Sequence, residues 1–493
     1  MGYRRCFAVS VTLVSLASLL LGAIPHPVPL TPPSYASVPG QDPFPTPMAI
    51  WSLSIADHRD NVGHDSLELD SGGRPHIGYS WGHPARDVRY AWFDGNSWIS
   101  ETVDSAGSVG QWTSLQLDAA DRPHMVYLDT THLDLRYAYH DGTAWITTTV
   151  DSVDRVGRFA SLSLDAADRP HIAYLDESNW NLKYAHYDGA KWQIEIVDTL
   201  YLPGWYTSIA VDADDQPHIA YHDRIQGSLK YARREGTGWH VEVVDPSNYA
   251  GWFASLALDA AGRPHISYCT NFYPRYLCDD LRYASYDGTT WVTTTVDSAG
   301  WTGGNTSLAL DAQGRPHIAY CHYWYSLEWS YCDELRYASF DGTGLGLHQG
   351  WQIEVVDTME TSDHTISLEL DTAGRPHISY SDLGAAELRY ATICTPVTGV
   401  EISGPGALIV GRAGTYTAGP VPVTATLPMT FTWDNGKAGP TSVYSWTVTG
   451  THPMTVTAVN GCGEGTGNQE VRVLAGWPNT FFLPLVAVPR RGD

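Results

Sequence analysis

The fold is indicated by the stretch SLALDAAGRPHISY at residues 255–268. Leu256 and Leu258 alternate with small or polar residues, and Ile266 and Tyr268 share one face of the second half. Alternation with a period of two is typical of β-strands, because successive side chains of a strand point to opposite faces. The stretch therefore predicts two short strands joined by a short turn.

Related stretches recur along the chain, and each is followed by the same further segments. A loop leads to Leu-Arg-Tyr-Ala, then to Asp-Gly-x-x-Trp and a run that ends in Val-Asp, so one copy holds four short strands. Asp287-Gly288 and its equivalents predict two-residue hairpin turns, because glycine tolerates the positive φ that such turns require. The copies recur at intervals of 47 to 60 residues, as shown by the histidines of their Pro-His motifs: His76, His124, His171, His218, His265, His317 and His377. Four-stranded sheets repeated at such intervals predict a β-propeller, in which each sheet packs against its neighbours.

The tryptophans of the outer strands predict the number of blades and the closure of the ring. Six of them follow their own copies: Trp98, Trp145, Trp192, Trp239, Trp291 and Trp351. The seventh copy ends at Tyr390-Ala391 without one, whereas Trp51 stands 47 residues before Trp98, the interval that also separates Trp98 from Trp145. We therefore predict an all-β chain with a seven-bladed β-propeller closed by an N-terminal outer strand, residues 51–57, which leaves no open sheet edge. A six- or eight-bladed ring would need one copy to be lost or unrecognised.

The repeated segments Asp-x-x-Gly-Arg-Pro-His-Ile-x-Tyr and Leu-Arg-Tyr-Ala resemble those of secreted bacterial propellers of the broad sialidase-like, BNR-like repeat class, over residues 49–392. The resemblance implies the fold but no single chemistry, because the class includes sialidases, polysaccharide lyases, lectins and proteins of unknown role. The Ser-x-Asp-x-Gly-x-x-Trp box of sialidases and an evident arginine triad are missing from the sequence. Sialidase activity is therefore not expected.

A β-sandwich is predicted to follow the propeller, at residues 393–475. Alternating runs such as Met429–Trp433 are broken there by Gly, Pro and Asn. Residues 444–460 resemble a PKD or related immunoglobulin-like module, although the acidic-glycine turn usual in PKD domains is reduced. The C-terminal tail, residues 476–493, is too short to span a membrane.

The N-terminal residues have the composition of an export signal. Arg4 and Arg5 precede an apolar run that ends at Leu21, so residues 1–23 are interpreted as a signal peptide and residues 24–48 as a proline-rich linker. The protein is expected to be secreted or bound to the cell surface, with no membrane span in the mature chain. Six cysteines would remain after cleavage, and we predict three local disulfides: Cys269–Cys278, Cys321–Cys332 and Cys394–Cys462. A zinc site is less favoured because neither loop pair has metal-ligand spacing.

Composition limits the possible partners. The 493 residues carry 54 acidic and 29 basic side chains, a net charge of −25, which argues against nucleic acid as the main partner. The same charge disfavours an acidic uronate polymer unless arginines or calcium intervene. No metal or cofactor is predicted, and we expect a monomer.

The residues that repeat in every copy are interpreted as structural. The motif histidines occupy one strand position in all copies, as expected of packing or hydrogen bonding between blades. The aspartates that open the turns, from Asp70 to Asp371, each supply one carboxylate, too few oxygens for a dedicated calcium site, and are predicted to cap turns. The tyrosines of Leu-Arg-Tyr-Ala and the outer tryptophans are predicted to lie in the core.

Variation between the copies points to one face of the propeller. The blade-to-blade loops of that face carry aromatic residues, and the fifth and sixth blades add two long, cysteine-flanked loops rich in aromatics. Exposed clustered aromatics commonly mark binding surfaces, although these rings could instead cover the channel mouth and pack on one another. The predicted ligand-binding residues are Trp112, Phe159, Trp205, Trp252, Tyr273, Tyr276, Tyr323, Trp324 and Trp329. Tyr206, Phe253 and Trp301 belong to the same loops.

The sequence favours a non-catalytic binding or adhesion protein whose partner is a carbohydrate or a protein surface. Asp223, Arg275 and Glu328 are its predicted polar anchors. The alternative is a polysaccharide lyase or glycosidase on the same face, and a third possibility is a purely structural surface protein. We predict no catalytic residue: the best candidates are more simply solvated loop residues. These candidates are Asp60, His64, Asp65, Asp363 and His364.

Overall fold

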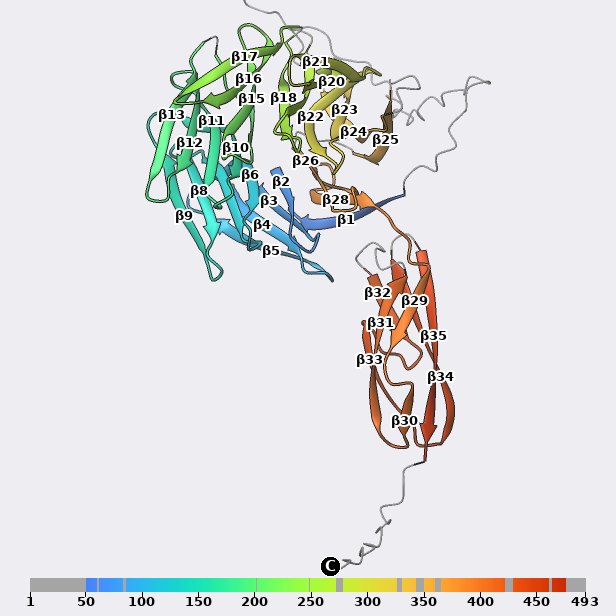
Figure 1. Cartoon of the computed structure of the whole chain (residues 1–493). Helices are drawn as coiled ribbons and strands as arrows, with labels where there is room; N and C mark the ends of the chain where they lie inside the picture. Colours follow the sequence, from blue (N-terminus) through green and yellow to red (C-terminus); the bar gives the residue numbers. More distant parts are fainter. Residues whose placement is uncertain are drawn as a thin grey trace, which may run out of the picture. The chain divides into compact units, whose positions relative to one another are not determined.

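The computed structural model describes residues 50–59, 62–82, 86–200, 202–247, 249–271, 278–325, 330–342, 350–359, 365–421, 429–460 and 463–475. The predicted signal peptide, linker and C-terminal tail lie outside the described residues. Within the described part the chain is all-β, and Trp51 to Ile393 form seven four-stranded antiparallel sheets (Figure 1). This arrangement is consistent with a β-propeller.

The sheets follow one another along the chain. The first consists of β2 (Val62–Leu69), β3 (Pro75–Trp81), β4 (Asp87–Phe93) and β5 (Trp98–Asp104). The second consists of β6 (Val109–Leu117), β7 (Pro123–Asp129), β8 (Asp134–His140) and β9 (Trp145–Asp151). The third consists of β10 (Val156–Leu164), β11 (Pro170–Asp176), β12 (Asn181–Tyr187) and β13 (Trp192–Asp198). The fourth consists of β14 (Trp205–Val211), β15 (Pro217–Asp223), β16 (Ser228–Glu235) and β17 (Gly238–Asp245).

The last three sheets have the same strand order. The fifth consists of β18 (Trp252–Leu258), β19 (Pro264–Asn271), β20 (Cys278–Tyr286) and β21 (Trp291–Asp297). The sixth consists of β22 (Trp301–Leu310), β23 (Pro316–Tyr325), β24 (Ser330–Phe340) and β25 (Trp351–Thr358). The seventh consists of β26 (Ile366–Leu370), β27 (Pro376–Asp382), β28 (Glu387–Ile393) and β1 (Trp51–His58). The N-terminal strand thus takes the outer place in the last sheet, with Trp51 opposite Ile393 and Leu53 opposite Ala391.

One hydrogen bond links each sheet to the next through the serine of the Ser-Leu-x-Leu segment. The backbone N–H of Leu162, in the third sheet, donates to Ser114 Oγ in the second at 3.1 Å. The equivalent bonds join Leu115 to Ser66, Ile209 to Ser161, Leu256 to Ser208, Leu308 to Ser255, Leu368 to Ser307 and Leu67 to Ser367. The last of these joins the first sheet to the seventh, across 300 residues of sequence.

The outer tryptophans make a second set of contacts between sheets. Trp145, in the second sheet, meets Tyr90 of the first edge to face, with ring centroids 5.4 Å apart. The same pairing occurs between Trp98 and Tyr390, Trp192 and Tyr137, Trp239 and Tyr184, Trp291 and Tyr231, Trp351 and Tyr283, and Trp51 and Tyr337. These tyrosines and tryptophans are buried or half-buried, as predicted.

The motif histidine bonds within its own sheet. His171 Nδ1 and the Tyr184 hydroxyl are 2.5 Å apart, and His171 Nε2 lies 3.3 Å from Asp165 Oδ2. Asp165 also accepts the backbone N–H groups of Ala167 and Arg169, so it caps the turn as predicted. All seven histidines are buried and hydrogen-bonded to the tyrosine of their own Leu-Arg-Tyr or related segment. The buried, hydrogen-bonded histidine agrees with the predicted structural role. Of the two roles expected between blades, packing or hydrogen bonding, the hydrogen bond is wrong, because the partner lies on the third strand of the same sheet.

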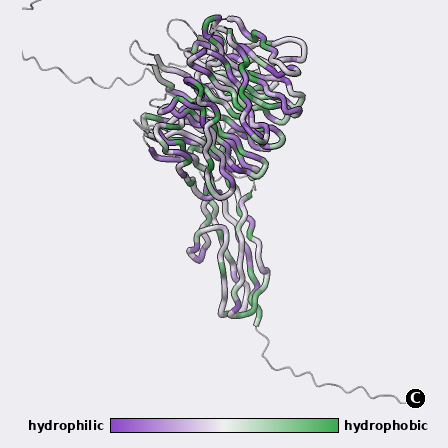
Figure 2. The backbone as a smooth tube through the Cα atoms, turned by 90° about the vertical axis from the view of Figure 1, so that its left-hand side faces the viewer, coloured by the Kyte–Doolittle hydropathy of each residue, from purple (hydrophilic) through white to green (hydrophobic). Residues whose placement is uncertain are grey.

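Two further sheets follow from Gly399 onwards. One has the order β29, β31, β33 and the other β30, β35, β34, β32. Their bounds are β29 (Gly399–Ser403), β30 (Ala407–Ile409), β31 (Ala413–Val421), β32 (Met429–Trp433), β33 (Thr441–Ser445), β34 (Gly450–Asn460) and β35 (Gly463–Leu474). Both sheets contribute to one apolar core that includes Tyr416, Trp433 and Met454, as expected of a β-sandwich. Apolar and polar residues are interspersed along the strands throughout the chain (Figure 2).

Two of the predicted disulfides are present. Cys269 pairs with Cys278 and Cys321 with Cys332, with Cα atoms 5.5 and 5.6 Å apart. Cys394 is disulfide-bonded, and its predicted partner Cys462 lies outside the described residues, so that pairing stays a prediction. No helix in the described part of the chain is long and apolar enough to cross a membrane.

Candidate functional site

The first strands of the seven sheets, here called the inner strands, share an irregularity near their start. In six of them the pairing register shifts by a bulge, for example between Arg158 and Ser161 in β10. A residue twelve positions before the motif histidine adopts a positive φ of 51–57° at this bulge. We call this place the lining position, and its occupants are His64, Trp112, Phe159, Tyr206, Phe253 and Asn305, with Thr365 in the seventh copy. A positive φ is uncommon for bulky residues, and bulges re-aim side chains away from the sheet.

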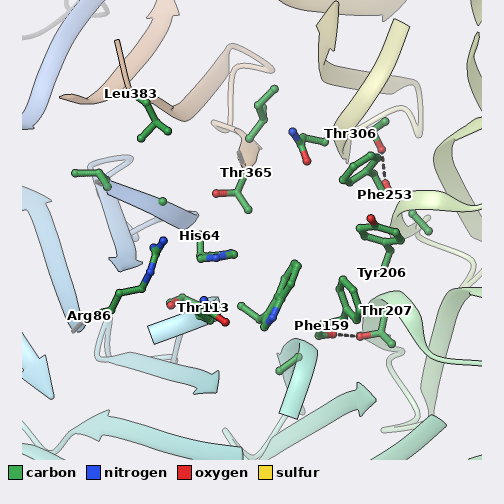
Figure 3. A pocket seen from close by; sticks show the side chains of 18 of the residues that line it. His64, Arg86, Thr113, Phe159, Tyr206, Thr207, Phe253, Thr306, Thr365 and Leu383 are labelled. Carbon is green, nitrogen blue, oxygen red and sulfur yellow. Dashed lines mark hydrogen bonds between the residues drawn. The ribbon is translucent and has the colours of Figure 1, made fainter. Parts of the chain in front are cut away.

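These seven side chains surround one cavity of about 530 Å³, here called the inner-strand cavity (Figure 3). The next residue of most copies also lines it, namely Thr113, Ala160, Thr207, Ala254, Thr306 and Ile366. Because every sheet contributes the lining position and six of the seven also contribute the next residue, the repeat itself creates the cavity. Differences between the copies then decide its chemistry.

Aromatic rings from four successive copies form a continuous wall on one side of the cavity. The ring centroids of Trp112 and Phe159 are 4.2 Å apart, those of Phe159 and Tyr206 4.8 Å, and those of Tyr206 and Phe253 4.5 Å. The interplanar angles are 47–52°, so the rings lean on one another in tilted contacts. We call these four rings the aromatic wall.

The remaining lining residues are mostly polar. Asn305 Nδ2 donates to the Tyr323 hydroxyl at 3.4 Å, and Arg86 donates to Ser80 Oγ at 3.1 Å. Burial, followed by the nearby positive charge of Arg86, lowers the pKa of His64 to about 3. His64 is therefore a neutral imidazole at physiological pH, and it can hydrogen-bond but holds no charge.

Asp65 lies beside the cavity but is committed to the contact between the first and seventh sheets. It is 4% exposed, and its carboxylate accepts hydrogen bonds from the hydroxyls of Thr365, at 2.7 Å, and Ser379, at 2.5 Å. Burial is the larger effect and raises the pKa of Asp65 to about 6, although these hydrogen bonds lower it. The expectation that His64 and Asp65 are solvated loop residues is wrong, because both lie in β2 and are wholly or partly buried.

A pair of glutamates occupies adjacent inner strands, a feature that the sequence reasoning missed. Burial raises the pKa of both carboxyls, that of Glu369 to about 7, and for Glu68 the charge of Glu369 adds to the effect. Gln116 Nε2 in the next sheet donates to Glu68 Oε1. The pair resembles a catalytic carboxylate pair in its raised pKa, but neither glutamate is among the residues that line the inner-strand cavity.

The predicted ligand-binding residues fall into three groups. Trp112, Phe159 and Tyr323 line the cavity. Trp205 and Trp252 do not, because the bulge turns the following residues, Tyr206 and Phe253, into it instead. Tyr273, Tyr276, Trp329 and the side chain of Trp324 lie outside the described residues.

Of the other predicted site residues, some lie within the described part of the chain and some outside it. Asp223 is not a surface anchor: it is fully buried, accepts the backbone N–H groups of Ile225 and Gln226, and lies 2.8 Å from Lys230 Nζ. Five candidates, Asp60, Arg275, Glu328, Asp363 and His364, lie outside the described residues. His64, Asn305 and Thr365 were not recognised as lining residues, although counting twelve positions back from each motif histidine would have found them.

Comparisons with known proteins find similarity at a low level. Neither a protein-family model nor a curated protein matches the sequence. The solved structure of AofleA from Arthrobotrys oligospora is 13% identical, covers 62% of this chain and 89% of its own, and has a TM-score of 0.42. An ulvan lyase of a new polysaccharide lyase family is 11% identical, with coverage of 67% and 93% and a TM-score of 0.46. The Aleuria aurantia lectin, solved with Fucα1-6GlcNAc, is 14% identical, with coverage of 61% and 97% and a TM-score of 0.39. Similarity at this level carries no information on ligand or activity.

Proposed function

We propose that the seven sheets are the blades of one closed β-propeller and that its inner-strand cavity binds a ring of a carbohydrate. The protein would then be a secreted or cell-surface carbohydrate-binding protein, with the propeller at residues 49–392 and a PKD or immunoglobulin-like domain at residues 393–475. Closure is supported by the hydrogen bond from Leu67 to Ser367, which repeats between the first and last sheets the bond found between all the others. Two disulfides support an oxidising, extracellular location.

The observation that carries the proposal is the division of the cavity into an aromatic wall and a polar side. A pyranose ring has an apolar C–H face, which stacks on aromatic rings, and a rim of hydroxyl groups, which needs hydrogen-bonding partners. Arg86, Asn305 and Thr365 offer such partners in the rest of the lining, as does His64, whose ring lies 4.8 Å from that of Trp112 at the end of the aromatic wall. A volume of about 530 Å³ lies within the usual range of small-ligand sites, in which apolar walls are combined with polar groups that fix the orientation of the ligand.

The same residues favour binding without catalysis. Among the described residues that line the cavity there is no carboxylate, whereas a glycosidase needs two flanking the scissile bond. The carboxylate of Asp65 is held by Thr365 and Ser379, and His64, with a pKa of about 3, is a weak base. The alternative of a polysaccharide lyase or glycosidase therefore has less support than a binding protein.

A glycan-array screen of the secreted chain, followed by calorimetric titration of the best ligand, tests the proposal. Tyr206→Asn and Phe253→Asn should each weaken binding at least about tenfold, the effect expected when a stacked ring is lost. Asn is the residue that the sixth copy carries at the lining position with a φ of 51°, so the fold should tolerate it. The matched control is Tyr139→Ser, which installs the residue of the fifth and sixth copies at a ring position outside the cavity.

The outcomes separate the candidate functions. Loss of binding in both cavity variants but not in the control supports the proposal. Unchanged binding in both variants would show that the inner-strand cavity is not the binding site. Release of reducing ends or unsaturated uronates by the wild-type chain would establish the enzyme alternative instead.

A further inference from the structure

A second group of aromatic and guanidinium groups continues the aromatic wall away from the cavity, over the third and fourth sheets. The ring of Trp205 lies 5.3 Å from Phe159, a member of the wall. Trp180, in the turn between β11 and β12, lies almost parallel to Trp205, with an interplanar angle of 6° and centroids 6.5 Å apart. Arg224, in the turn after β15, places its guanidinium carbon 4.6 Å from the centroid of Trp205.

Arg158 connects this group to the cavity. Its guanidinium carbon lies 5.3 Å from the ring centroid of Phe159 and 5.9 Å from those of Trp112 and Trp205. Arg158 also lines a smaller cavity of about 170 Å³, together with Arg155. Gln111 lines both this smaller cavity and the inner-strand cavity, so the two adjoin. We call the set Arg158, Trp180, Trp205 and Arg224 the aromatic–arginine track.

The charge of this region differs from that of the whole protein. Glu177 pairs with both Arg155, at 3.0 Å, and Arg158, at 2.7 Å, so one carboxylate faces two guanidinium groups. Arg224 is exposed and forms no ion pair with any described residue, and the neighbouring Asp223 is buried against Lys230. Asp154, whose carboxylate accepts a hydrogen bond from Asn179 at 3.2 Å, is the second exposed or half-buried carboxylate here, so three arginines face two carboxylates on a chain whose net charge is −25. Guanidinium groups suit planar, bidentate recognition of carboxylate and sulfate.

We propose that the aromatic–arginine track is a subsite for the anionic groups of an acidic oligosaccharide whose neighbouring ring occupies the inner-strand cavity. This inference rests on the proposed carbohydrate binding and names its substrate class. Arg158 and Arg224 bind the carboxylate or sulfate groups of successive sugars, and Trp205 and Trp180 stack against sugar rings. The alternation of rings and charges along the track matches an anionic glycan, in which charged groups alternate with apolar ring faces.

The copies themselves supply matched substitutions for the test. Arg158→Gln introduces the residue type that the second copy has at the equivalent position, Gln111. Arg224→Thr likewise introduces the type found at Thr130 of that copy. Trp180→Leu installs Leu133, which has the same left-handed backbone conformation. These variants should fold like the wild type, as unfolding curves will check. Affinities are then measured by titration with neutral, uronate-containing and sulfated oligosaccharides of equal length, and with the cognate monosaccharide.

We expect the wild type to bind an acidic oligosaccharide at least about tenfold more tightly than the neutral one, with a preference that declines as salt increases. Uronate and sulfate are the two possible sources of the anion, and their relative affinities identify which one is bound. The Arg158→Gln, Arg224→Thr double variant should lose that preference while its affinity for the monosaccharide stays unchanged. Trp180→Leu should weaken binding of the oligosaccharides only.

Two results would overturn the inference. If the double variant keeps the acidic preference while Phe253→Asn weakens binding as expected, the track is not a subsite but the proposed function stands. If polyglutamate of equal charge binds the wild type as tightly as the acidic oligosaccharide, the track recognises charge on a peptide rather than a glycan. If neither the oligosaccharides nor the monosaccharide bind to the wild type, the proposed function and this inference are rejected together.

Discussion

Two positions on neighbouring strands of every copy show opposite behaviour. The motif histidine is the same residue in all seven copies, and in each it is buried with a bond to a tyrosine of its own sheet. The lining position, twelve residues earlier, carries six residue types in seven copies. The difference indicates that the repeated residues build the sheets and their contacts, whereas the residues that vary determine what the cavity can bind.

The largest effect should come from removing a whole strand of the repeated framework. Deletion of residues 50–58 takes away β1, which pairs with β28 and places Trp51 against Tyr337. The deletion would expose the edge of β28 and an apolar surface, so we expect aggregation or a large decrease in melting temperature. An unchanged melting curve would show that the seven sheets do not depend on the N-terminal strand.

A single motif histidine should have a smaller but clear effect on stability. His171→Ala leaves the hydroxyl of Tyr184, a buried residue, without its hydrogen-bond partner. Leaving a buried polar group unsatisfied costs about 1–3 kcal/mol. Denaturant unfolding should show this loss for His171→Ala. Unchanged stability of that variant would contradict the structural role of the histidine.

The glutamate pair predicts a pH-dependent contribution to the free energy of unfolding. Unlike the hydrogen bond of the motif histidine, an ionised glutamate at this place destabilises the folded state. The pKa of Glu369 is raised to about 7 from 4.5, mainly by burial, so its carboxyl favours the folded state while it is protonated. That contribution is complete below about pH 4.5 and is lost as the pH rises through 7. Glu369→Gln, which installs the residue found at Gln116, should therefore stabilise the protein at pH 8 relative to the wild type, by on the order of 1–2 kcal/mol. The gain should shrink or vanish at pH 4.5, and a gain independent of pH would contradict the raised pKa.

Sequence periodicity was sufficient to predict the framework but not the cavity. The strands and the N-terminal outer strand follow from local alternation and from the 47-residue interval between Trp51 and Trp98, which the pairing of β1 with β28 confirms. Period two cannot decide whether Trp205 or Tyr206 faces the cavity, because the bulge in β14 breaks the alternation there. The partner of the motif histidine and the burial of Glu68 depend on which strands come together in space. Neither has a signal within its own segment of sequence.

The smallest effect on stability, and the sharpest contrast with the histidines, is expected at the lining position. Phe253→Asn removes a half-buried ring from the cavity, but it places at a φ of 54° the residue type that the sixth copy holds at 51°. Asn is among the residues that tolerate this conformation best, which offsets part of the lost ring contact with Tyr206. We expect the free energy of unfolding to change by less than about 1 kcal/mol, while affinity for the cavity ligand decreases at least about tenfold. A large loss of stability would show instead that the aromatic wall belongs to the core, and the contrast between the two positions would then disappear.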